Sequence, residues 1–489
     1  MPKSDIPAPE AAVSRPDLAA LDPSGRLYNE DLAPTPADDR RWSTYSLFAL
    51  WMNDAHNVGV YTFAAAMFAM GLPAWQVTVG ILLGIVVVFL GCNLSGFMGK
   101  DTGLPFPVVS RLSWGVFGAN VPALIRAVVA IAWYGIQTYL ASVAILEVLR
   151  RFLPGAARLS EFHLLGLDGL SWISFMLLWA IQLVVLSRGM EVVRHLQGWS
   201  GPALWLVMIA IAVWLVIRAG GDVSFTKSVT NLPAGEQAYQ TLAVAGLSVG
   251  ALASLMLNFS DFARFAPSRK SVVRGNFWGL PVNWTLFAVT SVVISAASVT
   301  VYGHPMINPL ELLSDMDNGF LLVISAIVVV LAAVGVNIVA NFVSPAYDLA
   351  NVWPKRIDFR KGGLITAILA VVSLPWKLFS SPVVITYFMG GLGALLGPLF
   401  GVMATDYFLV RRQQVVMADL FTPDSASRYY YRRGVNPVAC IAFGLGAVVA
   451  LVVALVPLFH RVAPFSWFLG AAISAAVYLV LSRRAVETR

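Results

Sequence analysis

The sequence predicts an all-α polytopic membrane protein in which twelve transmembrane helices form a single domain. Of its 489 residues, 58% are hydrophobic and only 12% are charged, whereas a soluble protein carries about a quarter charged residues. Apolar runs of about 20 residues, each long enough to cross a bilayer core of about 30 Å, recur along the whole chain. The predicted spans cover residues 43–71, 74–98, 120–149, 170–187, 199–218, 240–262, 275–302, 319–345, 362–377, 383–409, 435–457 and 464–482.

The charged residues predict how these spans are oriented in the membrane. Residues 1–41 are polar, rich in Pro and Ala and without an apolar signal-peptide core, so we expect a flexible cytoplasmic tail. The transmembrane domain then covers 42–482, and 483–489 form a short C-terminal tail. With both termini in the cytoplasm, the tails and even-numbered loops hold most of the Lys and Arg, the pattern of a plasma or inner membrane protein. The net charge of +7 therefore reflects topology in a lipid bilayer and does not indicate nucleic-acid binding.

The chain contains no motif for a metal, a cofactor or covalent catalysis. Cys92 and Cys440 are its only cysteines, and both lie in apolar segments. The five histidines are scattered, and HExxH, CxxC and nucleophile–base patterns are absent. We therefore expect no cofactor, no metal site and no enzymatic activity, although a membrane-embedded enzyme stays an alternative at this point.

The first span carries an unusual polar cluster in its middle. The stretch "ALWMNDAHNVGVY" places Asn53, Asp54, His56 and Asn57 within five positions, and Gly59 follows. Such side chains cost a few kcal/mol each in the bilayer centre, so they usually face a protein interior or a watery cavity. The cluster predicts a helix that unwinds here and exposes its backbone to a binding cavity, as in carriers built from inverted repeats.

An inverted repeat of five spans predicts a matching break in the sixth span. That span contains Gly246, Ser248, Gly250 and Ser254 within the apolar run "AVAGLSVGALASLMLNFSDF". Glycine alone is common in membrane helices, but its position here corresponds to the polar cluster of the first span. We therefore expect the sixth helix to be broken as well.

The third and eighth spans carry further polar groups at helical spacing. Trp133 and Gln137 lie at i and i+4 in the third span, hence on one helical face, and Asn337 and Asn341 have the same spacing in the eighth. An indole can stack on a flat ring, and a primary amide offers a donor and an acceptor to its edge. This pattern favours a flat, neutral, heterocyclic ligand.

Six sequence motifs resemble the nucleobase:cation symporter-1 family over essentially the whole chain, and most closely its uracil, allantoin and hydantoin permease branch. The motifs are "LYNEDLAP", "WMNDAHNVGVYT", "AWYGIQTYL", "LNFSDFARFAPS", "NFVSPAYDLANVWP" and "GPLFGVMATDYFLVRR". The resemblance implies a LeuT-like fold with broken helices 1 and 6. Its two inverted repeats would cover about 43–218 and 240–409, and two extra helices about 435–482.

The resemblance also implies a substrate site. In hydantoin-carrying members the ligand stacks on the residue that matches Trp133 and is hydrogen-bonded by those that match Gln137 and Asn341. A second Trp of those members aligns with Leu252, which argues against a bulky aryl-hydantoin. The substrate-binding residues we expect are Trp133, Gln137, Asn341, Asn57, Asn337, Ala251, Leu252, Ser254 and the gate residue Phe388.

The coupling ion is predicted from a departure from the family pattern. Sodium-coupled members hold the ion with two helix 8 hydroxyl groups, and the aligned residues here are Gly335 and Val336. Neither side chain contains an oxygen, the ligand that a hard cation prefers. We therefore expect protons rather than sodium to drive transport. The ion-coupling or gating candidates are Asn53, Asp54, His56, Asp261 and Asp348.

Two of these acids also have a purely structural interpretation. Asp261 and Asp348 lie near cytoplasmic helix ends, where they could simply pair with Arg264, Lys355 or Arg356. Asp406 has the same interpretation beside Arg411 and Arg412.

The sequence as a whole predicts a secondary active transporter. It would import uracil, allantoin or a related nucleobase or ureide with a co-transported cation, by alternating access. An amino-acid or other small-solute carrier of the same fold is the runner-up, and a channel or a non-transporting nutrient sensor stays open. The candidate ligands share alternating donors and acceptors, so the pattern does not choose among them.

Overall fold

Helices make up nearly all of the regular structure in this computed structural model, which describes residues 21–69, 71–186, 190–221, 232–306, 318–380 and 382–487. The long helices and the segments that continue them are α1 Thr44–Ala55, α2 Val58–Ala69, α3 Ala74–Thr102, α4 Phe106–Trp114, α5 Asn120–Phe152, α6 Gly169–Leu186, α7 Met190–Arg218, α8 Ala234–Asn258, α9 Ser260–Ala263, α10 Arg269–Phe277, η5 Trp278–Trp284, α11 Thr285–Tyr302, α13 Gly319–Val336, η6 Asn337–Phe342, α14 Val343–Val352, α15 Phe359–Val372, α16 Pro375–Ser380, α17 Pro382–Ala404, η7 Thr405–Val410, α18 Pro437–Leu455 and α19 Ser466–Glu487. The short elements are the 3₁₀ helices η2 Glu30–Leu32, η3 Ala37–Asp39, η4 Pro154–Glu161, η8 Ala418–Leu420, η9 Pro457–Phe459 and η10 Ala463–Phe465, and the two-residue strands β1 His163–Leu164 and β2 Leu167–Asp168.

The predicted all-α membrane fold is confirmed. Each predicted apolar segment coincides with helix, and nine helices within the described ranges are long and apolar enough to cross a membrane. The short β1–β2 hairpin is antiparallel and pairs His163 with Asp168. At the other end of the chain, α19 continues to Glu487, into the C-terminal tail expected at 483–489.

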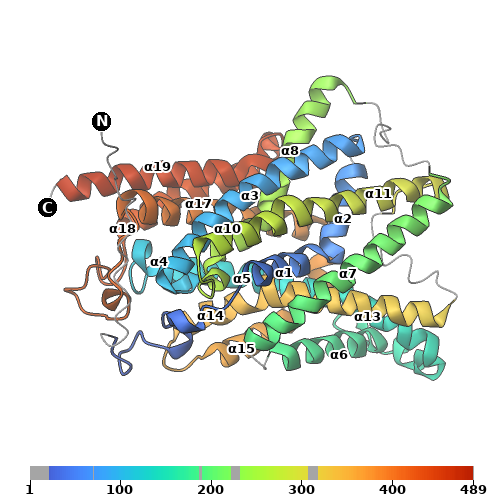
Figure 1. The fold of residues 1–489 in the computed structure, drawn as a ribbon, viewed down its shortest axis with the longest axis horizontal. Coiled ribbons are helices and arrows are strands. Elements are labelled where there is room, and N and C mark those ends of the chain that lie inside the picture. The colour runs from blue at the N-terminus through green and yellow to red at the C-terminus, as the bar shows by residue number, and fades with distance from the viewer. Residues whose placement is uncertain are drawn as a thin grey trace, which may run out of the picture.

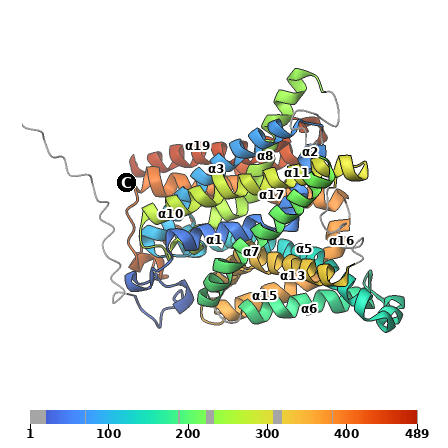
Figure 2. The ribbon, with the colours of Figure 1, turned by 45° about the vertical axis from the view of Figure 1, so that its right-hand side comes forward.

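The helices pack as groups that are far apart in the sequence (Figures 1 and 2). One group joins α1 to α10 and η5, and α3 to α8. The other packs α5 against α6, α13 and α14, with α15 on α14, and α7 contacts α1, α11 and α13. The last two helices, α18 and α19, pack on each other and on α17, which in turn contacts α8.

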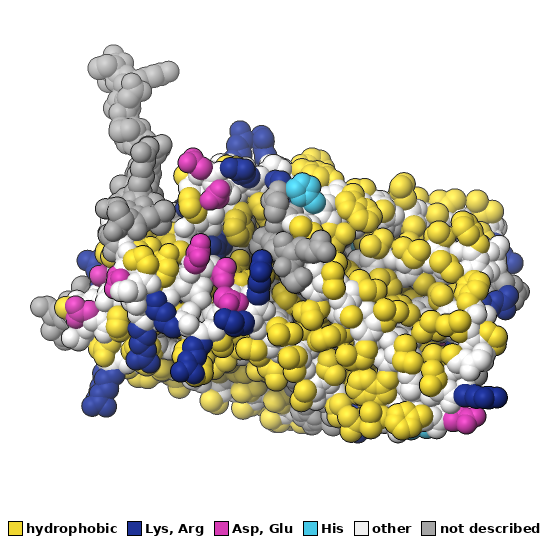
Figure 3. Space-filling model, turned by 90° about the horizontal axis from the view of Figure 1, so that it is seen from below, with side chains coloured by type: hydrophobic (Ala, Val, Ile, Leu, Met, Phe, Trp, Pro, Cys, Tyr) yellow, Lys and Arg dark blue, Asp and Glu magenta, His cyan; other side chains and the backbone are white. Residues whose placement is uncertain are grey.

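The surface has the polarity of a protein that spans a bilayer. Figure 3 shows acidic and basic side chains mainly towards one end, while the broad area beside them is almost entirely hydrophobic. Many large apolar side chains of the protein are strongly exposed, for example Leu206, Ile217 and Phe320, at 72% each. Such exposure would be costly in water and is expected where lipid chains cover the protein.

The predicted break in the first span is confirmed. Helix α1 ends at Ala55 and α2 begins at Val58, with His56 in a non-helical conformation. The side chain of Asn57 serves both ends, because its Nδ2 donates to the carbonyl of Asp54 and its Oδ1 accepts from the backbone N–H of Val60 at 3.1 Å. Helix ends leave unpaired backbone groups, so one amide side chain compensates part of the cost of the break.

The expected break in the middle of the sixth span was wrong. Helix α8 runs without interruption from Ala234 to Asn258 and includes Gly246 and Gly250. Glycine lowers helix stability but keeps its backbone N–H, and the hydroxyl of Ser248 donates to the carbonyl of Val244 within the helix. The helix ends at Asn258, near the cytoplasmic end expected for this span, and the short helix α9 begins at Ser260.

A departure that the sequence did not indicate lies in the eighth span. Between α13 and α14, residues Asn337–Phe342 form a π-helical segment, η6, that contains both predicted asparagines. A π-helical turn inserts an extra residue into the helix and is frequent at functional sites. The inserted turn therefore coincides with the predicted ligand-binding face.

Much of the N-terminal tail expected to be flexible is packed against the helices. Within 1–41 the structure describes 21–41, and this segment contributes buried leucines to the core. Asn29 Nδ2 donates to the carbonyl of Pro354 at 2.7 Å. The guanidinium of Arg264 donates to two backbone carbonyls of the same segment at 3.1 and 3.0 Å. The polar composition of 21–41 thus reflects specific capping of helix ends and not disorder.

Candidate functional site

Two cavities are lined in part by the first span, one at its break and one at Phe63 of α2. The larger, of about 220 Å³, is lined by Trp133 of α5, Ala251 and Ser254 of α8, and residues of α17 and α19; we call it the Trp133 cavity. The smaller, of about 80 Å³, is lined by His56, Asn57 and residues of α7, α11 and α13; we call it the His56 cavity.

The Trp133 cavity brings together three of the predicted substrate-binding residues. Trp133, Ala251 and Ser254 line it, as expected. Leu252 does not line it, because its side chain points into the hydrophobic core and is only 6% exposed. Helical geometry explains this difference, since neighbouring residues of a helix point about 100° apart. Phe388 lies in α17, but its side chain is outside the described residues.

The amide of Gln137 lies one turn from Trp133 on α5 and reaches the broken helix. Gln137 Nε2 donates to Asn57 Oδ1 at 3.4 Å, a long hydrogen bond. Gly59 leaves the space for this pair, because a Cβ atom at that position would lie 2.8 Å from Gln137 Nε2 and 3.0 Å from Asn57 Oδ1. The glycine beside the polar cluster is therefore required by a close approach of side chains.

The two asparagines of the eighth span have different environments. Asn341 Nδ2 donates to Asn337 Oδ1 at 2.9 Å. Asn337 Nδ2 in turn donates to Gln182 Oε1 at 3.0 Å and to Thr138 Oγ1 at 3.1 Å. Asn337 is fully buried, and its side chain holds Asn341 in place. Gln182 and Thr138 were not singled out by the sequence analysis, because no spacing rule links either of them to the eighth span.

Asn53 and His56 both take part in contacts between helices. Ser200 Oγ of α7 donates to Asn53 Oδ1 at 2.6 Å, and a Cβ atom at Gly335 would lie 2.5 Å from the same oxygen. His56 Nε2 lies 3.1 Å from Asn283 Oδ1, and its ring stacks on Phe287 at 4.8 Å. Asn53 therefore fills the space opposite Gly335, where a longer side chain would clash.

Asp54 is the acidic member of the polar cluster. It is 4% exposed, and its Oδ2 atom has no hydrogen-bond partner among the residues that the structure describes. A buried carboxylate oxygen without a partner is costly unless a proton, a cation or a water reaches it.

A second group of buried charges lies where α5, α9 and α14 meet. Arg126, Asp261 and Asp348 are all fully buried. Arg126 Nη2 donates to the carbonyl of Ala340 at 2.7 Å, while its Nε and Nη1 atoms have no partner in the described part of the chain. We call these three residues the charge cluster.

The two acids of the charge cluster are held differently. Asp261 Oδ1 accepts from the backbone N–H of Phe106 at 2.7 Å, and Asp261 Oδ2 accepts from Asn258 Nδ2 at 3.1 Å. Neither oxygen of Asp348 has a hydrogen-bond partner in the described ranges; Arg126 attracts this carboxylate and Asp261 repels it. With all three groups ionised, the cluster would carry one excess negative charge.

The structural pairings expected for these acids were wrong. Arg264 is engaged by Thr35 Oγ1 at 2.7 Å and by the N-terminal backbone, and Lys355 Nζ donates to a backbone carbonyl at 2.8 Å. The cation that attracts Asp348 is instead Arg126. It was not among the predicted site residues, although an Arg inside an apolar span often indicates a functional site. The expected ion pair between Asp406 and Arg411 is present at 2.7 Å.

Comparison with known proteins gives a consistent picture. A family model for permeases for cytosine/purines, uracil, thiamine and allantoin matches residues 34–470. The allantoin permease of Bacillus subtilis is 38% identical over 94% of both chains. The purine-uracil permease NCS1 of Arabidopsis thaliana is 31% identical over 92% of this chain and 74% of its own length.

Solved structures support the fold. Mhp1, a nucleobase-cation-symport-1 family transporter solved in a closed conformation with bromovinylhydantoin bound, has a TM-score of 0.77. It is 24% identical, over 94% of this chain and 96% of its own. A sodium-coupled sialic acid symporter has a TM-score of 0.61 at 14% identity, covering 91% of both chains. The chain belongs to the nucleobase:cation symporter-1 family of permeases for cytosine/purines, uracil, thiamine and allantoin, and is a multi-pass membrane transporter rather than an enzyme.

Proposed function

We propose that this transporter imports allantoin, uracil or a closely related flat nitrogen heterocycle across the cell membrane by proton symport, with both termini in the cytoplasm. The observation that carries the proposal is an indole at a cavity with two amides nearby: Gln137, one turn from Trp133 on α5, and Asn341 on η6, which packs against α5. The relatives named an allantoin permease and a purine-uracil permease, each matched over more than nine-tenths of this chain, support the same ligand class.

In the proposed binding mode, the substrate is held by ring stacking and by hydrogen bonds to its edge. The ring of the substrate stacks on Trp133, between that indole and the small Ala251. The amides of Gln137 and Asn341 pair with the N–H and C=O groups on the ring edge. Each amide already has one internal partner, Asn57 and Asn337 respectively, which fixes its orientation before the ligand arrives.

The energy required of this site is modest. A micromolar dissociation constant corresponds to about −8 kcal/mol, and a carrier gains nothing from binding so tightly that release becomes slow. One stacked ring and two or three hydrogen bonds in a cavity of about 220 Å³ are sufficient for that net value. A cavity of this size also suits a small monocyclic ligand better than a large one.

Proton coupling is proposed for two reasons. First, the position where a helix 8 hydroxyl would be needed for sodium is Gly335, and the side chain of Asn53 already fills the space in front of it. Second, the charge cluster holds two carboxylates and one guanidinium in a fully buried site. A buried excess negative charge is strongly unfavourable, so uptake of one proton stabilises the cluster.

We assign the proton to Asp348 in preference to Asp54. Both oxygens of Asp348 are buried without a hydrogen-bond partner in the described ranges, and Asp348 also faces the like charge of Asp261. Asp261 is the less suitable carrier, because its two hydrogen bonds favour its ionised form. Asp54 and His56 then shape the break in the first span, and Asp261 helps to close the cytoplasmic half.

The test is counterflow and gradient-driven uptake in proteoliposomes that contain the purified protein. We expect saturable counterflow with allantoin or uracil, and accumulation driven by an inward pH gradient both with and without sodium. Accumulation that requires sodium and ignores the pH gradient would contradict the coupling assignment. Counterflow with amino acids but with neither heterocycle would contradict the substrate assignment, and binding without any uptake would indicate a sensor.

A further inference from the structure

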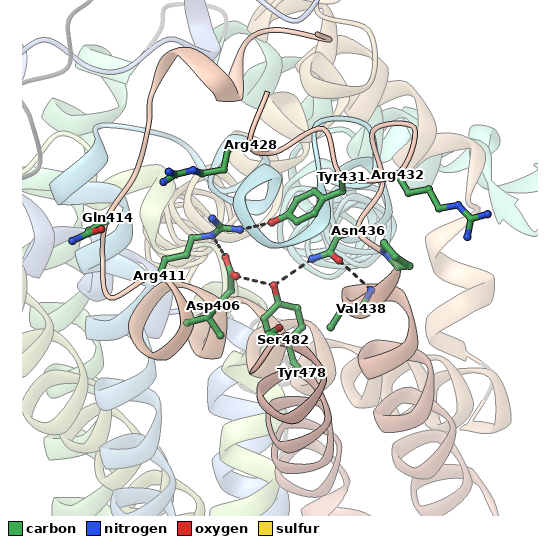
Figure 4. A pocket seen from close by; sticks show the side chains of 12 residues that line it. Asp406, Arg411, Gln414, Arg428, Tyr431, Arg432, Asn436, Val438, Tyr478 and Ser482 are labelled. Carbon is green, nitrogen blue, oxygen red and sulfur yellow. Dashed lines mark hydrogen bonds and ion pairs between the residues drawn. The ribbon is translucent and has the colours of Figure 1, made fainter. Parts of the chain in front are cut away.

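A large cavity lies away from the Trp133 cavity, at the end of the bundle where α17, α18 and α19 meet the segment 411–436 (Figure 4). Its volume is about 590 Å³. The lining residues come from η7, from that segment, from the N-terminus of α18 and from the last turns of α19. We call it the arginine cavity, because Arg411, Arg428 and Arg432 all line it.

The base of the arginine cavity is a fixed network of polar side chains. Arg411 Nε pairs with Asp406 Oδ2 at 2.7 Å, and Tyr478 OH donates to Asp406 Oδ1 at 2.7 Å. Arg411 Nη2 also donates to the carbonyl of Leu112 at 2.9 Å, and Asn436 Nδ2 lies 3.3 Å from Tyr478 OH. Among the described residues, Asp406 is the one carboxylate that lines the cavity, and its own arginine, Arg411, neutralises it.

The rim of the cavity carries two arginines without such a partner. Arg428 and Arg432 are exposed, and Figure 4 shows them on either side of Tyr431. In the portion of the chain that is described, neither guanidinium forms an ion pair. The nearby acids are engaged with backbone, because Asp419 Oδ2 accepts from the N–H of Arg428 at 3.1 Å and Asp424 Oδ1 from another N–H at 2.9 Å. Of the described residues that line the cavity, three are arginines and one is an aspartate, so this lining carries a net positive charge.

The surroundings of the cavity indicate where its ligand comes from. The outer face of α18, which begins at the cavity, exposes Ile441 and Leu445 at 52% each and Val448 at 61%. This apolar face continues from the charged rim along the helix, as acyl chains continue from a headgroup. A free phosphate would need the arginines alone and would gain nothing from the apolar face.

We propose that the arginine cavity binds the phosphate of an anionic phospholipid whose acyl chains lie along α18. Guanidinium groups bind phosphate oxygens through paired, charge-assisted hydrogen bonds, so Arg428 and Arg432 would hold the headgroup from two sides. The dipole at the N-terminus of α18 adds a favourable field for an anion. In the orientation proposed above this end faces the cytoplasm, where anionic lipids are enriched and basic pockets between helices hold their headgroups.

The test compares lipid retention by the purified full-length transporter in detergent. Phosphatidylglycerol, phosphatidylcholine and inorganic phosphate are titrated separately, and bound lipid is measured by native mass spectrometry. We expect retention of phosphatidylglycerol but not of phosphatidylcholine, and no displacement by millimolar inorganic phosphate. The double variant R428Q/R432Q should bind phosphatidylglycerol about 30-fold more weakly, since each cation near a membrane surface contributes about a fivefold factor.

A matched control separates a specific site from the loss of positive charge. The double variant R360Q/R274Q removes the same charge from two exposed arginines that do not line the cavity, and it should retain phosphatidylglycerol like the wild type. Equal retention by wild type and R428Q/R432Q would overturn the proposal, as would equal loss in both double variants. Tight binding of inorganic phosphate that displaces the lipid would overturn the lipid assignment. Substrate counterflow, measured in parallel, reports separately on the proposed transport function.

Discussion

Replacing Arg126 by Gln should strongly lower the stability of the folded protein, so that little folded protein remains. The guanidinium is fully buried and is the cation of the charge cluster, where Asp261 and Asp348 are fully buried as well. The substitution leaves two carboxylates in the protein interior without a positive charge. Removing one partner of a direct buried ion pair costs about 3–5 kcal/mol, and Arg126 acts on the two acids at longer range, because it forms no direct ion pair with either in the described ranges. We therefore expect a loss towards the lower end of that range, still a large part of the roughly 5–15 kcal/mol that typically stabilises a domain.

A second substitution should restore stability, and the structure predicts which one. In R126Q/D348N the remaining acid is Asp261, whose oxygens keep hydrogen bonds from the Phe106 backbone at 2.7 Å and from Asn258 at 3.1 Å. In R126Q/D261N the remaining acid is Asp348, whose oxygens have no partner in the described ranges. The first double variant should therefore recover most of the lost stability and the second much less.

The assay heats detergent-solubilised variants that are expressed at equal levels. The fraction of protein that stays monodisperse is then measured by size-exclusion chromatography. We expect a coupling free energy between Arg126 and Asp348 of about 2 kcal/mol or more, above the value for independent sites. The single variant D348N should fold, retain counterflow and lose accumulation driven by a pH gradient. Wild-type stability of R126Q, or equal recovery in both double variants, would refute the reasoning.

Three further predictions concern the substrate site and the coupling ion. Trp133→Ala and Asn341→Ala should each abolish uptake at unchanged expression. The control Trp278→Ala removes an indole that is 52% exposed on the outer surface and should leave uptake intact. Uptake by either site variant at the wild-type rate would argue against the site. Gly59→Ala should lower uptake at least about tenfold, because its Cβ atom would lie 2.8 Å from Gln137 Nε2 and displace that amide; an unchanged substrate KM in initial-rate measurements would show that this amide does not contact the ligand. Replacing sodium by choline in the transport buffer should leave initial rates unchanged, and a sodium-dependent rate would indicate a cation site elsewhere in the protein.

The sequence predicted a break in the first span correctly and a break in the middle of the sixth wrongly, and one physical reason explains both outcomes. A helix ends where side chains compensate its unpaired backbone groups, and Asn57 provides that compensation from both of its polar ends. The sixth span has glycines but no side chain of this kind in its middle, and Ser248 donates to a carbonyl of its own helix. Flexibility alone does not open a helix in an apolar environment.

Helical spacing predicted pairs within a helix but not partners between helices. Trp133 and Gln137 share a face, as expected, and Trp133 lines the cavity. The groups that hold Asn337, in contrast, come from two other helices, and no pattern along the chain links them. Arg126 was missed for a related reason. Its electrostatic partner Asp348 lies more than two hundred residues away in sequence, and such an interaction can be recognised only once the topology is known.

The arrangement of α5 and the eighth span indicates how the two sites can be coupled. Along α5, Trp133 follows Arg126 by two turns, about 10 Å; along η6 and α14, Asp348 follows Asn341 by the same interval. The helices run antiparallel, because Arg126 bonds the carbonyl of Ala340, whereas Asn337, nearer the start of the eighth span, donates to a hydroxyl later on α5.

The tie between these two helices determines which elements must move. Since hydrogen bonds from Asn337 join them, α5 and the eighth span are expected to move as one unit that carries both the ring-stacking face and most of the charge cluster. The partner groups lie outside this unit: Asn57 is at the helix break, and Asp261 is on α9. Under the proposed function, a substrate would alter the contact between Gln137 and Asn57, and a proton on Asp348 would remove its repulsion with Asp261. Both events act across the same boundary, so one relative motion of the two units can respond to substrate and proton together.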